Sequence, residues 1–157
     1  MNHTFEPVYN AHSNVLILGT FPSVKSREQH FFYGNPQNRF WKVISAITNT
    51  PLPLTIEAKK AMLLEHGIAI WDVIQSCEIT GSSDSSIKNV VPMDFSPILK
   101  SASIQRIYAN GATAEKLYQT YCEATTKMGI IKLPSTSPAN AAFSLEKLIE
   151  AWSVIRH

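Results

Sequence analysis

Four short apolar runs alternate with longer amphipathic segments along this chain, and this alternation constrains the fold more than any other feature. The runs predict strands over 14–18, 68–73, 104–109 and 129–133. Strands that alternate with helices are typical of a mainly parallel sheet covered by helices on both faces. We therefore expect an α/β fold built around a four-stranded sheet.

The helices are predicted from apolar residues that recur at helical spacing. They are expected over 38–48, 57–65 and 112–124, and again after Ser144. Ser144 is expected to cap the last helix at its start, because a serine oxygen accepts a free backbone N–H there. Two helices therefore separate the first pair of strands.

Length and composition bound the domain count and the chemistry. A chain of 157 residues with 45% hydrophobic content can bury one substantial core, so we expect a single domain over 1–157. The net charge of +2 permits a polyanionic partner without requiring one. Cys77 and Cys122 lie far apart, with no His or Cys at ligand spacing. We expect buried, reduced thiols and neither a metal site nor a cofactor.

The sequence predicts neither a targeting segment nor a membrane-spanning helix. Residues 1–13 lack a basic start followed by an apolar run, and no later stretch is apolar enough to cross a bilayer. We expect a soluble, cytoplasmic protein with no membrane partner. No apolar heptad predicts a helical oligomer, so we expect a monomer.

The first strand is followed by a Gly/Pro turn over 19–23 and then by an aromatic and carboxamide cluster over 33–41. At a strand end of an open α/β sheet, such segments form a pocket for a flat polar ring. The carboxamide of Asn38 can bond a base edge or orient a water, although an Asn at a helix start also commonly caps the helix. Phe21 and Tyr33 are either aromatic walls of this pocket or packing residues.

Two loops follow strands on the same side of the sheet. The loop over 133–141 is rich in small hydroxyl residues and prolines, so it can approach a phosphate backbone or enter a groove, or simply connect two elements. The segment 81–86 is either a flexible linker or a binding loop. Asp72 and Asp84 near it can position a water or make local hydrogen bonds.

Other catalytic signatures are absent from the sequence. It has no phosphate-binding Gly-rich loop with its Lys, no dinucleotide fingerprint and no nucleophile elbow around a Ser. His30 and Lys42 lie near the cluster but are expected to be exposed. The predicted pocket is therefore where function should be sought.

At the segments 19–23, 33–44 and 135–148 the chain resembles the uracil-DNA glycosylase superfamily, and within it the DNA-deoxyinosine (hypoxanthine-DNA) glycosylase branch. Matches at 67–73 and 81–89 extend the resemblance over nearly the whole chain. It implies a three-layer α/β/α sandwich whose four-stranded, mainly parallel sheet has the order 2-1-3-4. It also implies a monofunctional enzyme of base excision repair that binds duplex DNA, flips out a deaminated nucleotide and hydrolyses the bond between base and sugar.

The chain departs from most of the superfamily at two positions. Phe21 stands where relatives place the Asn or Asp that positions water, and Ser135 stands where uracil-specific enzymes have a His. The resemblance therefore implies poor uracil excision. In the deoxyinosine branch the catalytic carboxamide corresponds to Asn38, which we expect to be the catalytic residue.

The resemblance also implies roles for the surrounding residues. Tyr33 would stack on the base and Phe21 would close the pocket floor. The residues expected to bind the base are Gly19, Thr20, Phe21, Tyr33 and Gln37. Those expected to bind DNA are Ser135, Thr136, Ser137, Pro138 and Asn140.

Three other functions stay open. The chain can be a uracil-specific or mismatch-specific DNA glycosylase, or a non-catalytic DNA-binding or nucleotide-binding module on the same fold. Hydrolysis of free nucleosides is disfavoured, because such an enzyme has little use for a loop that enters a DNA groove.

Overall fold

The structure is a computed structural model that describes residues 1–156. Four strands form one parallel sheet in the order β2-β1-β5-β6. They are β1 (Val15–Gly19), β2 (Ile68–Asp72), β5 (Arg106–Asn110) and β6 (Ile130–Leu133). Numbered along the chain, these strands have the order 2-1-3-4, so the predicted sheet is confirmed.

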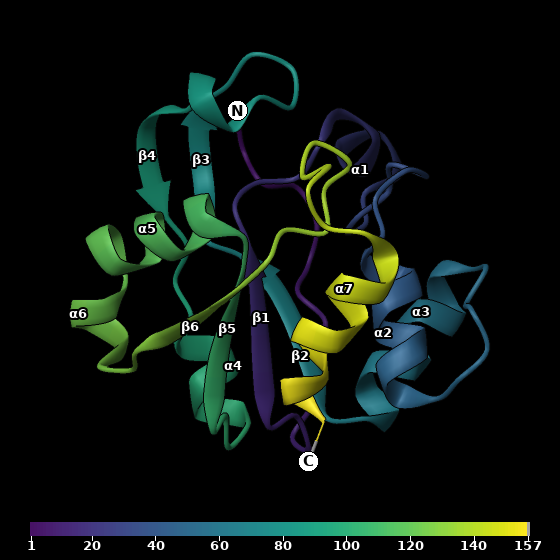
Figure 1. The fold of residues 1–157 in the computed structure, drawn as a ribbon. Coiled ribbons are helices and arrows are strands. Elements are labelled where there is room, and N and C mark those ends of the chain that lie inside the picture. The colour runs from purple at the N-terminus through teal and green to yellow at the C-terminus, as the bar shows by residue number, and fades with distance from the viewer. Residues whose placement is uncertain (157) are drawn as a thin grey trace.

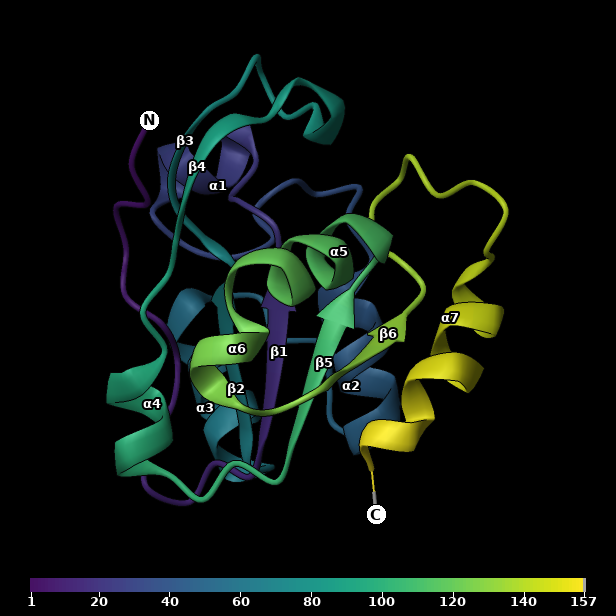
Figure 2. The ribbon, with the colours of Figure 1, turned by 90° about the vertical axis from the view of Figure 1, so that its left-hand side faces the viewer.

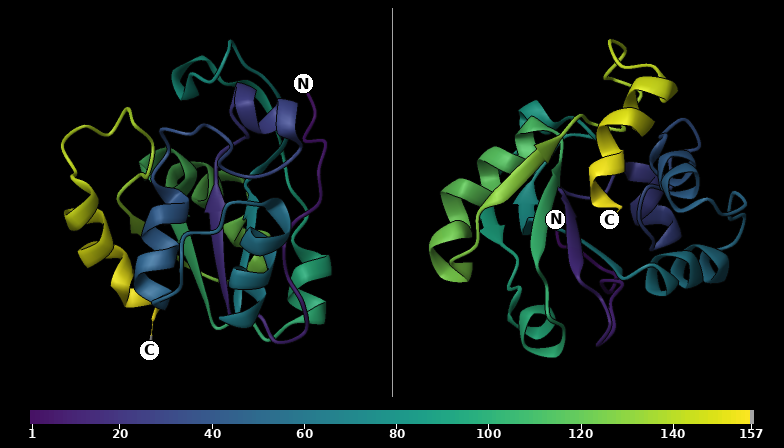
Figure 3. Two further views of the ribbon diagram at one scale, coloured as in Figure 1. Left: turned by 90° about the vertical axis from the view of Figure 1, so that its right-hand side faces the viewer. Right: turned by 60° about the horizontal axis from the view of Figure 1, so that its bottom comes forward.

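Helices cover both faces of this sheet, as expected for a three-layer sandwich (Figures 2 and 3). On one face lie α2 (Phe40–Thr48), α3 (Ile56–Glu65) and α7 (Leu145–Trp152), and on the other α4 (Ser96–Ser101) and α5 (Ala112–Tyr121). All five residues of β1 are buried, and its apolar side chains alternate between the two cores. This explains the unbroken apolar run in the sequence, because a strand covered on both faces needs apolar side chains throughout.

The helix predicted over 112–124 is interrupted. It ends as α5 at Tyr121 and resumes after Cys122 as the short α6 (Glu123–Thr126). The Tyr118 hydroxyl donates to the Met128 carbonyl oxygen over 2.7 Å, which holds the chain after Cys122 back against α5. Helical spacing in the sequence cannot reveal this tertiary contact.

A β-hairpin that the sequence did not predict stands beyond the end of β2. Its strands are β3 (Ile74–Glu78) and β4 (Lys88–Pro92), and its loop includes the single turn η1 (Asp84–Ser86). Ile74 and Cys77 pack against Phe21 in a small core of their own. The segment 81–86 is therefore the tip of an anchored hairpin rather than a linker.

Three segments rise beyond the carboxyl edge of the sheet. They are the hairpin, the short helix α1 (Val24–Gln29) and the loop over 134–143 (Figure 1). The last two elements along the described chain are α7 and the short turn η2 (Ser153–Ile155). The predicted pocket should lie among these segments.

Cys77 and Cys122 are both buried and free, and burial raises the pKa of the Cys122 thiol to about 11. Within residues 1–156, no group of His, Cys, Asp and Glu is arranged to hold a metal ion. No helix in that range is both long and apolar enough to cross a membrane.

Candidate active site

A cavity of about 570 Å³ opens at the carboxyl edge of the sheet. This volume lies in the range of about 300–1,000 Å³ that is typical of small-molecule sites. The ends of β1, β2 and β5, the hairpin tip and the loop over 134–143 all contribute to its wall. The expected residues in that wall are Gly19, Thr20, Phe21, Tyr33, Asn38, Ser135, Thr136, Ser137 and Pro138.

Asn38 lines this cavity just before α2 begins at Phe40. Its Oδ1 accepts the backbone N–H of Phe40 over 2.9 Å and the hydroxyl of Thr136 over 2.8 Å. A backbone N–H can only donate, so the atom that it contacts must be the carbonyl oxygen of the carboxamide. Asn38 lies one residue before Arg39, the N-cap of α2, so it is not the cap itself, although its side chain bonds the first N–H of the helix while it lines the cavity.

The Asn38 amide nitrogen is left free by this arrangement. Among residues 1–156, Nδ2 has no hydrogen-bond acceptor, whereas Oδ1 already has two donors. A side chain held in this way offers N–H groups to whatever enters the cavity. The Asn38 side chain is therefore suited to donate a hydrogen bond to a base and poorly suited to accept one from a water.

Thr136 and Asn110 hold Asn38 in this orientation. The Asn110 amide donates to the Thr136 hydroxyl over 3.0 Å, and the hydroxyl donates onward to Asn38. The side-chain oxygen Oδ1 of Asn110 in turn accepts the backbone N–H of Thr136 over 3.0 Å. A connected polar network of this kind fixes side-chain positions better than isolated contacts do.

Arg39 fastens the loop over 134–143 to the start of α2. Its backbone N–H donates to the carbonyl oxygen of Thr136 over 3.1 Å. Its guanidinium donates to the carbonyl oxygens of Ser137 over 2.8 Å and Asn140 over 3.1 Å, and also to that of Phe143. The planar fork of Arg suits several acceptors at once, so this side chain shapes the loop instead of reaching for a phosphate.

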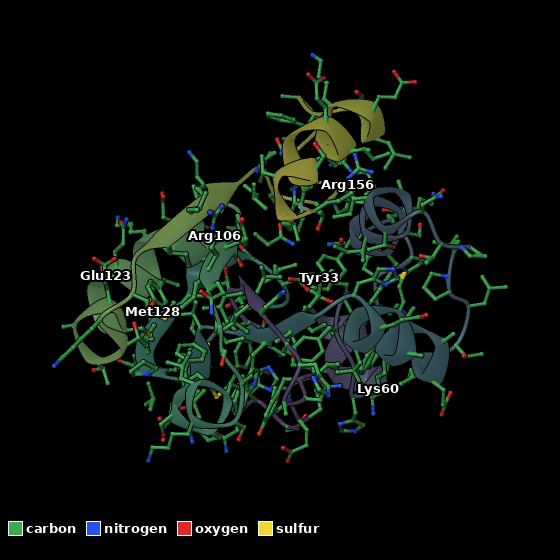
Figure 4. All side chains as sticks on the ribbon, turned by 90° about the horizontal axis from the view of Figure 1, so that it is seen from below. Tyr33, Lys60, Arg106, Glu123, Met128 and Arg156 are labelled. Atoms are coloured by element: carbon green, nitrogen blue, oxygen red, sulfur yellow. The ribbon has the colours of Figure 1, made fainter. Side chains whose placement is uncertain are left out.

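Tyr33 lies deep in the site, near the middle of the molecule when it is seen from below (Figure 4). One face of its ring stacks on Phe40, with ring centres 4.0 Å apart. Its hydroxyl is buried without a hydrogen-bond partner among the described residues. Burial and the nearby charge of Asp72 raise the pKa of this hydroxyl, so it stays a neutral donor at physiological pH.

The backbone of Tyr33 is also unusual. Its φ of 51° lies in the left-handed region, which a bulky side chain rarely adopts. Such strain persists only where the surroundings over-determine it, and it is concentrated at functional sites.

Two carboxyl groups line the cavity as well. Asp72 is buried at the end of β2, and its Oδ2 lies 2.8 Å from Nε2 of His3. Asp84, at the hairpin tip, is exposed on its outer side. Partial burial and the charge of Asp72 raise the pKa of Asp84.

Two of the expected contacts need correction. Gln37 is exposed and lies outside the cavity wall, so it is not placed to bind a base in this structure. Thr136 is completely buried and cannot touch DNA, and its hydroxyl serves Asn38 instead. The Asn140 amide donates to the Ser135 carbonyl oxygen over 3.0 Å, which braces the loop, and its contact with DNA stays a prediction.

Sequence reasoning missed His3, Arg39 and Asn110 as site residues. Asn110 ends a strand at the same sheet edge as the cavity, which is a signal that could have found it. Nothing local marks His3, because it reaches Asp72 across 69 residues of sequence. Arg39 belonged to the polar cluster, but its role depends on a loop about a hundred residues away in the chain.

The geometry agrees with comparisons to known proteins. The family model of the uracil DNA glycosylase superfamily matches residues 6–156. The chain belongs to the uracil-DNA glycosylase superfamily. Its pocket at the carboxyl edge of the sheet is therefore the candidate active site of a superfamily member.

Two curated relatives of this superfamily member are named hypoxanthine DNA glycosylase. One, from Methanosarcina acetivorans, is 33% identical over 98% of this chain and 97% of its own length. The other, from Methanosarcina barkeri, is 33% identical over 61% of each chain. The solution NMR structure of a candidate uracil DNA glycosylase from Methanosarcina acetivorans has a TM-score of 0.80 and 28% identity, over 98% of this chain and 97% of that one.

Proposed function

We propose that this protein is a monofunctional DNA glycosylase that removes a flipped, deaminated base from duplex DNA, with hypoxanthine as the preferred base. The observation that carries the proposal is the restrained carboxamide of Asn38 in a cavity large enough for a purine. Superfamily membership and the names of the two curated relatives support the same conclusion.

The reaction breaks the bond between base nitrogen N9 and sugar carbon C1′. The electron pair leaves with the base, and a water adds its oxygen to C1′ and loses a proton. The departing base takes up one proton in exchange, so the products are an abasic sugar and neutral hypoxanthine. Negative charge builds on the departing base, so a donor fixed beforehand beside it lowers the barrier.

Asn38 is the catalytic residue of this proposal. Its free Nδ2 donates to an acceptor atom of the base, while its Oδ1 stays bound to Phe40 and Thr136. Phe21 packs as part of the pocket floor, and the Tyr33 hydroxyl is buried at the cavity wall without a partner among residues 1–156. The main chain at Gly19 and Thr20 lies close enough to line the base site.

The loop over 135–140 is the proposed DNA contact. The hydroxyls of Ser135 and Ser137 each accept a backbone N–H inside the loop, and each keeps its own hydrogen to donate to a phosphate. Pro138 and Ala139 are exposed at the loop tip, where a small apolar wedge can take the place of the flipped base. The site is complete within one chain, so we propose a monomer, acting on cytoplasmic DNA.

The experiment is a single-turnover assay on labelled duplexes containing inosine, uracil, xanthine or ethenocytosine. We expect abasic product, with the highest rate from inosine and little from uracil. Binding to these duplexes without abasic product from any of them would support a non-catalytic module instead. A preference for uracil would support the uracil-specific alternative.

A further inference from the structure

A buried imidazole and carboxylate stand at the cavity, and the reaction above does not use them. Asp72 is 4% exposed, and its Oδ2 lies 2.8 Å from Nε2 of His3. His3 belongs to an N-terminal segment held to the hairpin by its backbone N–H, which donates to the Gln75 carbonyl oxygen over 2.7 Å. Aromatic rings enclose the imidazole, with Phe5 4.5 Å and Phe21 6.1 Å away between centres. The pair is therefore built into the protein and does not fluctuate as a surface contact would.

Only one of the two carboxylate oxygens is satisfied by this pair. Among residues 1–156, Oδ1 of Asp72 has no hydrogen-bond partner. A Cβ placed on Gly19 would lie 2.6 Å from this oxygen and 3.0 Å from the Tyr33 hydroxyl. The absent side chain at Gly19 thus leaves a lone acceptor and a lone donor beside the same point. Of these two atoms the Tyr33 hydroxyl is buried, and buried polar atoms without partners are rare in proteins, a ligand being one reason for them.

The His3 contact also decides what Oδ1 can do. Nε2 donates to Oδ2 of the carboxylate, and Oδ1 of the same carboxylate is left as an acceptor. An amide at this position would lack this constraint, since it can turn and present a donor.

We propose that Asp72, positioned by His3, selects the flipped base by accepting its ring N–H, while the Tyr33 hydroxyl donates to the neighbouring ring carbonyl oxygen. This inference rests on the proposed function and names the feature of the base that is recognised. Deamination of adenine turns N1 from an acceptor into an N–H and replaces the 6-amino group with a carbonyl. Adenine therefore faces Asp72 with a lone pair, and this contact becomes repulsive, whereas the Tyr33 hydroxyl can turn and accept from the amino group. Discrimination against adenine is therefore assigned to Asp72.

The contact acts on selection more than on bond cleavage. An acceptor at N1–H adds electron density to the base, which does not help it to leave with an electron pair. Its value lies in holding the deaminated base and rejecting the normal one, because a site that leaves buried polar atoms unpaired discriminates strongly. Uracil has a comparable ring N–H, so this contact distinguishes deaminated bases from adenine and not uracil from hypoxanthine.

The test compares duplexes that carry hypoxanthine or 1-methylhypoxanthine, in which a methyl group replaces the ring hydrogen. The quantity is the single-turnover rate constant at saturation divided by the enzyme concentration for half-saturation. We expect the wild type to prefer hypoxanthine by about 100-fold. In Asp72→Ala the hypoxanthine value should fall by about 100-fold, and the preference should disappear. When the wild type and Asp72→Ala are compared on the same base, the leaving ability of that base is the same for both proteins and cancels.

Matched variants separate the specific contact from general effects. Asp84→Asn removes the other carboxylate of the cavity wall and should leave the preference unchanged. His3→Ala should weaken the preference, and His3→Gln should restore it, because the glutamine amide can donate to Oδ2 as Nε2 does. Rescue by Gln distinguishes positioning from a merely structural role.

The outcomes distinguish this inference from the proposed function. If the wild type releases no hypoxanthine, the proposed function is wrong. If it releases hypoxanthine but cleaves the 1-methyl base equally well, or if Asp72→Ala keeps the preference, the recognition of the ring N–H by Asp72 is wrong. The wild-type comparison needs no variant, so it stands even if Asp72→Ala fails to fold.

Discussion

The hydroxyl of Thr136 donates to Oδ1 of Asn38 over 2.8 Å, and Nδ2 of Asn38 has no acceptor among residues 1–156. This single contact joins the loop that is expected to meet DNA to the residue that is expected to act on the base. Positioning of the loop and orientation of the catalytic group are therefore coupled.

Thr136→Val removes this hydroxyl at nearly constant volume. It leaves the Asn110 amide and Asn38 Oδ1 each without one partner, so we expect the free energy of unfolding to fall by about 1–3 kcal/mol. Hypoxanthine release should slow by about 10-fold, because the carboxamide can then rotate. Urea unfolding and single-turnover assays measure the two effects. Thr136→Ser keeps the hydroxyl and is the control; equal losses in both variants would contradict the role of the contact.

Arg39→Lys keeps the charge but loses the planar fork that holds four loop carbonyl oxygens. We expect the loop to loosen and the DNA concentration for half-saturation to rise by about 10-fold. The rate constant at saturation should change less, since bound DNA reorders the loop. A titration of inosine duplex measures both quantities. An unchanged half-saturation value would show that the clamp does not serve DNA binding.

Gly19→Ala places a methyl group 2.6 Å from Oδ1 of Asp72. The carboxylate must move, so we expect loss of hypoxanthine binding and excision while the sheet still forms. Gly129→Ala is the matched control, because a Cβ at Gly129 meets no atom within 4 Å. Activity assays beside thermal unfolding separate the two variants. Normal excision by Gly19→Ala would mean that the base does not approach this point.

The fold was accessible from the sequence because each strand of the main sheet contains a short apolar run, over 15–18, 68–71, 107–109 and 130–131. The hairpin was not, since only Ile74 and Cys77 of β3 are fully buried and the strand shows no clean alternation. Asn38 could be singled out by its place beside a strand end. The role of Thr136 could not, because its hydroxyl contacts Asn110 and Asn38 at separations of 26 and 98 residues, and a Ser/Thr-rich loop gives no sign of which hydroxyl turns inward.

Asp84 provides a test through pH. Partial burial and the charge of Asp72 raise its pKa, so the folded protein binds this proton more tightly than the unfolded chain does. The stability contributed by Asp84 is therefore greatest at low pH, and it declines as pH rises from the unfolded pKa of about 4 through the folded pKa. Asp84→Asn removes this dependence, so its stability relative to the wild type should increase with pH over that window. Urea unfolding at a series of pH values measures the difference, and a flat difference would contradict the shift.

The most direct measurement compares Asn38→Asp with Asn38→Ala in single-turnover release of hypoxanthine from an inosine duplex. The carboxylate introduced by Asn38→Asp would keep an acceptor for Phe40 and Thr136 but would lack the N–H donor. The account therefore predicts that both variants lose at least about 100-fold in rate, with folding retained. Asn38→Asp activity equal to or above that of the wild type would contradict the account, because the carboxamide would then act by accepting from a water and not by donating to the base.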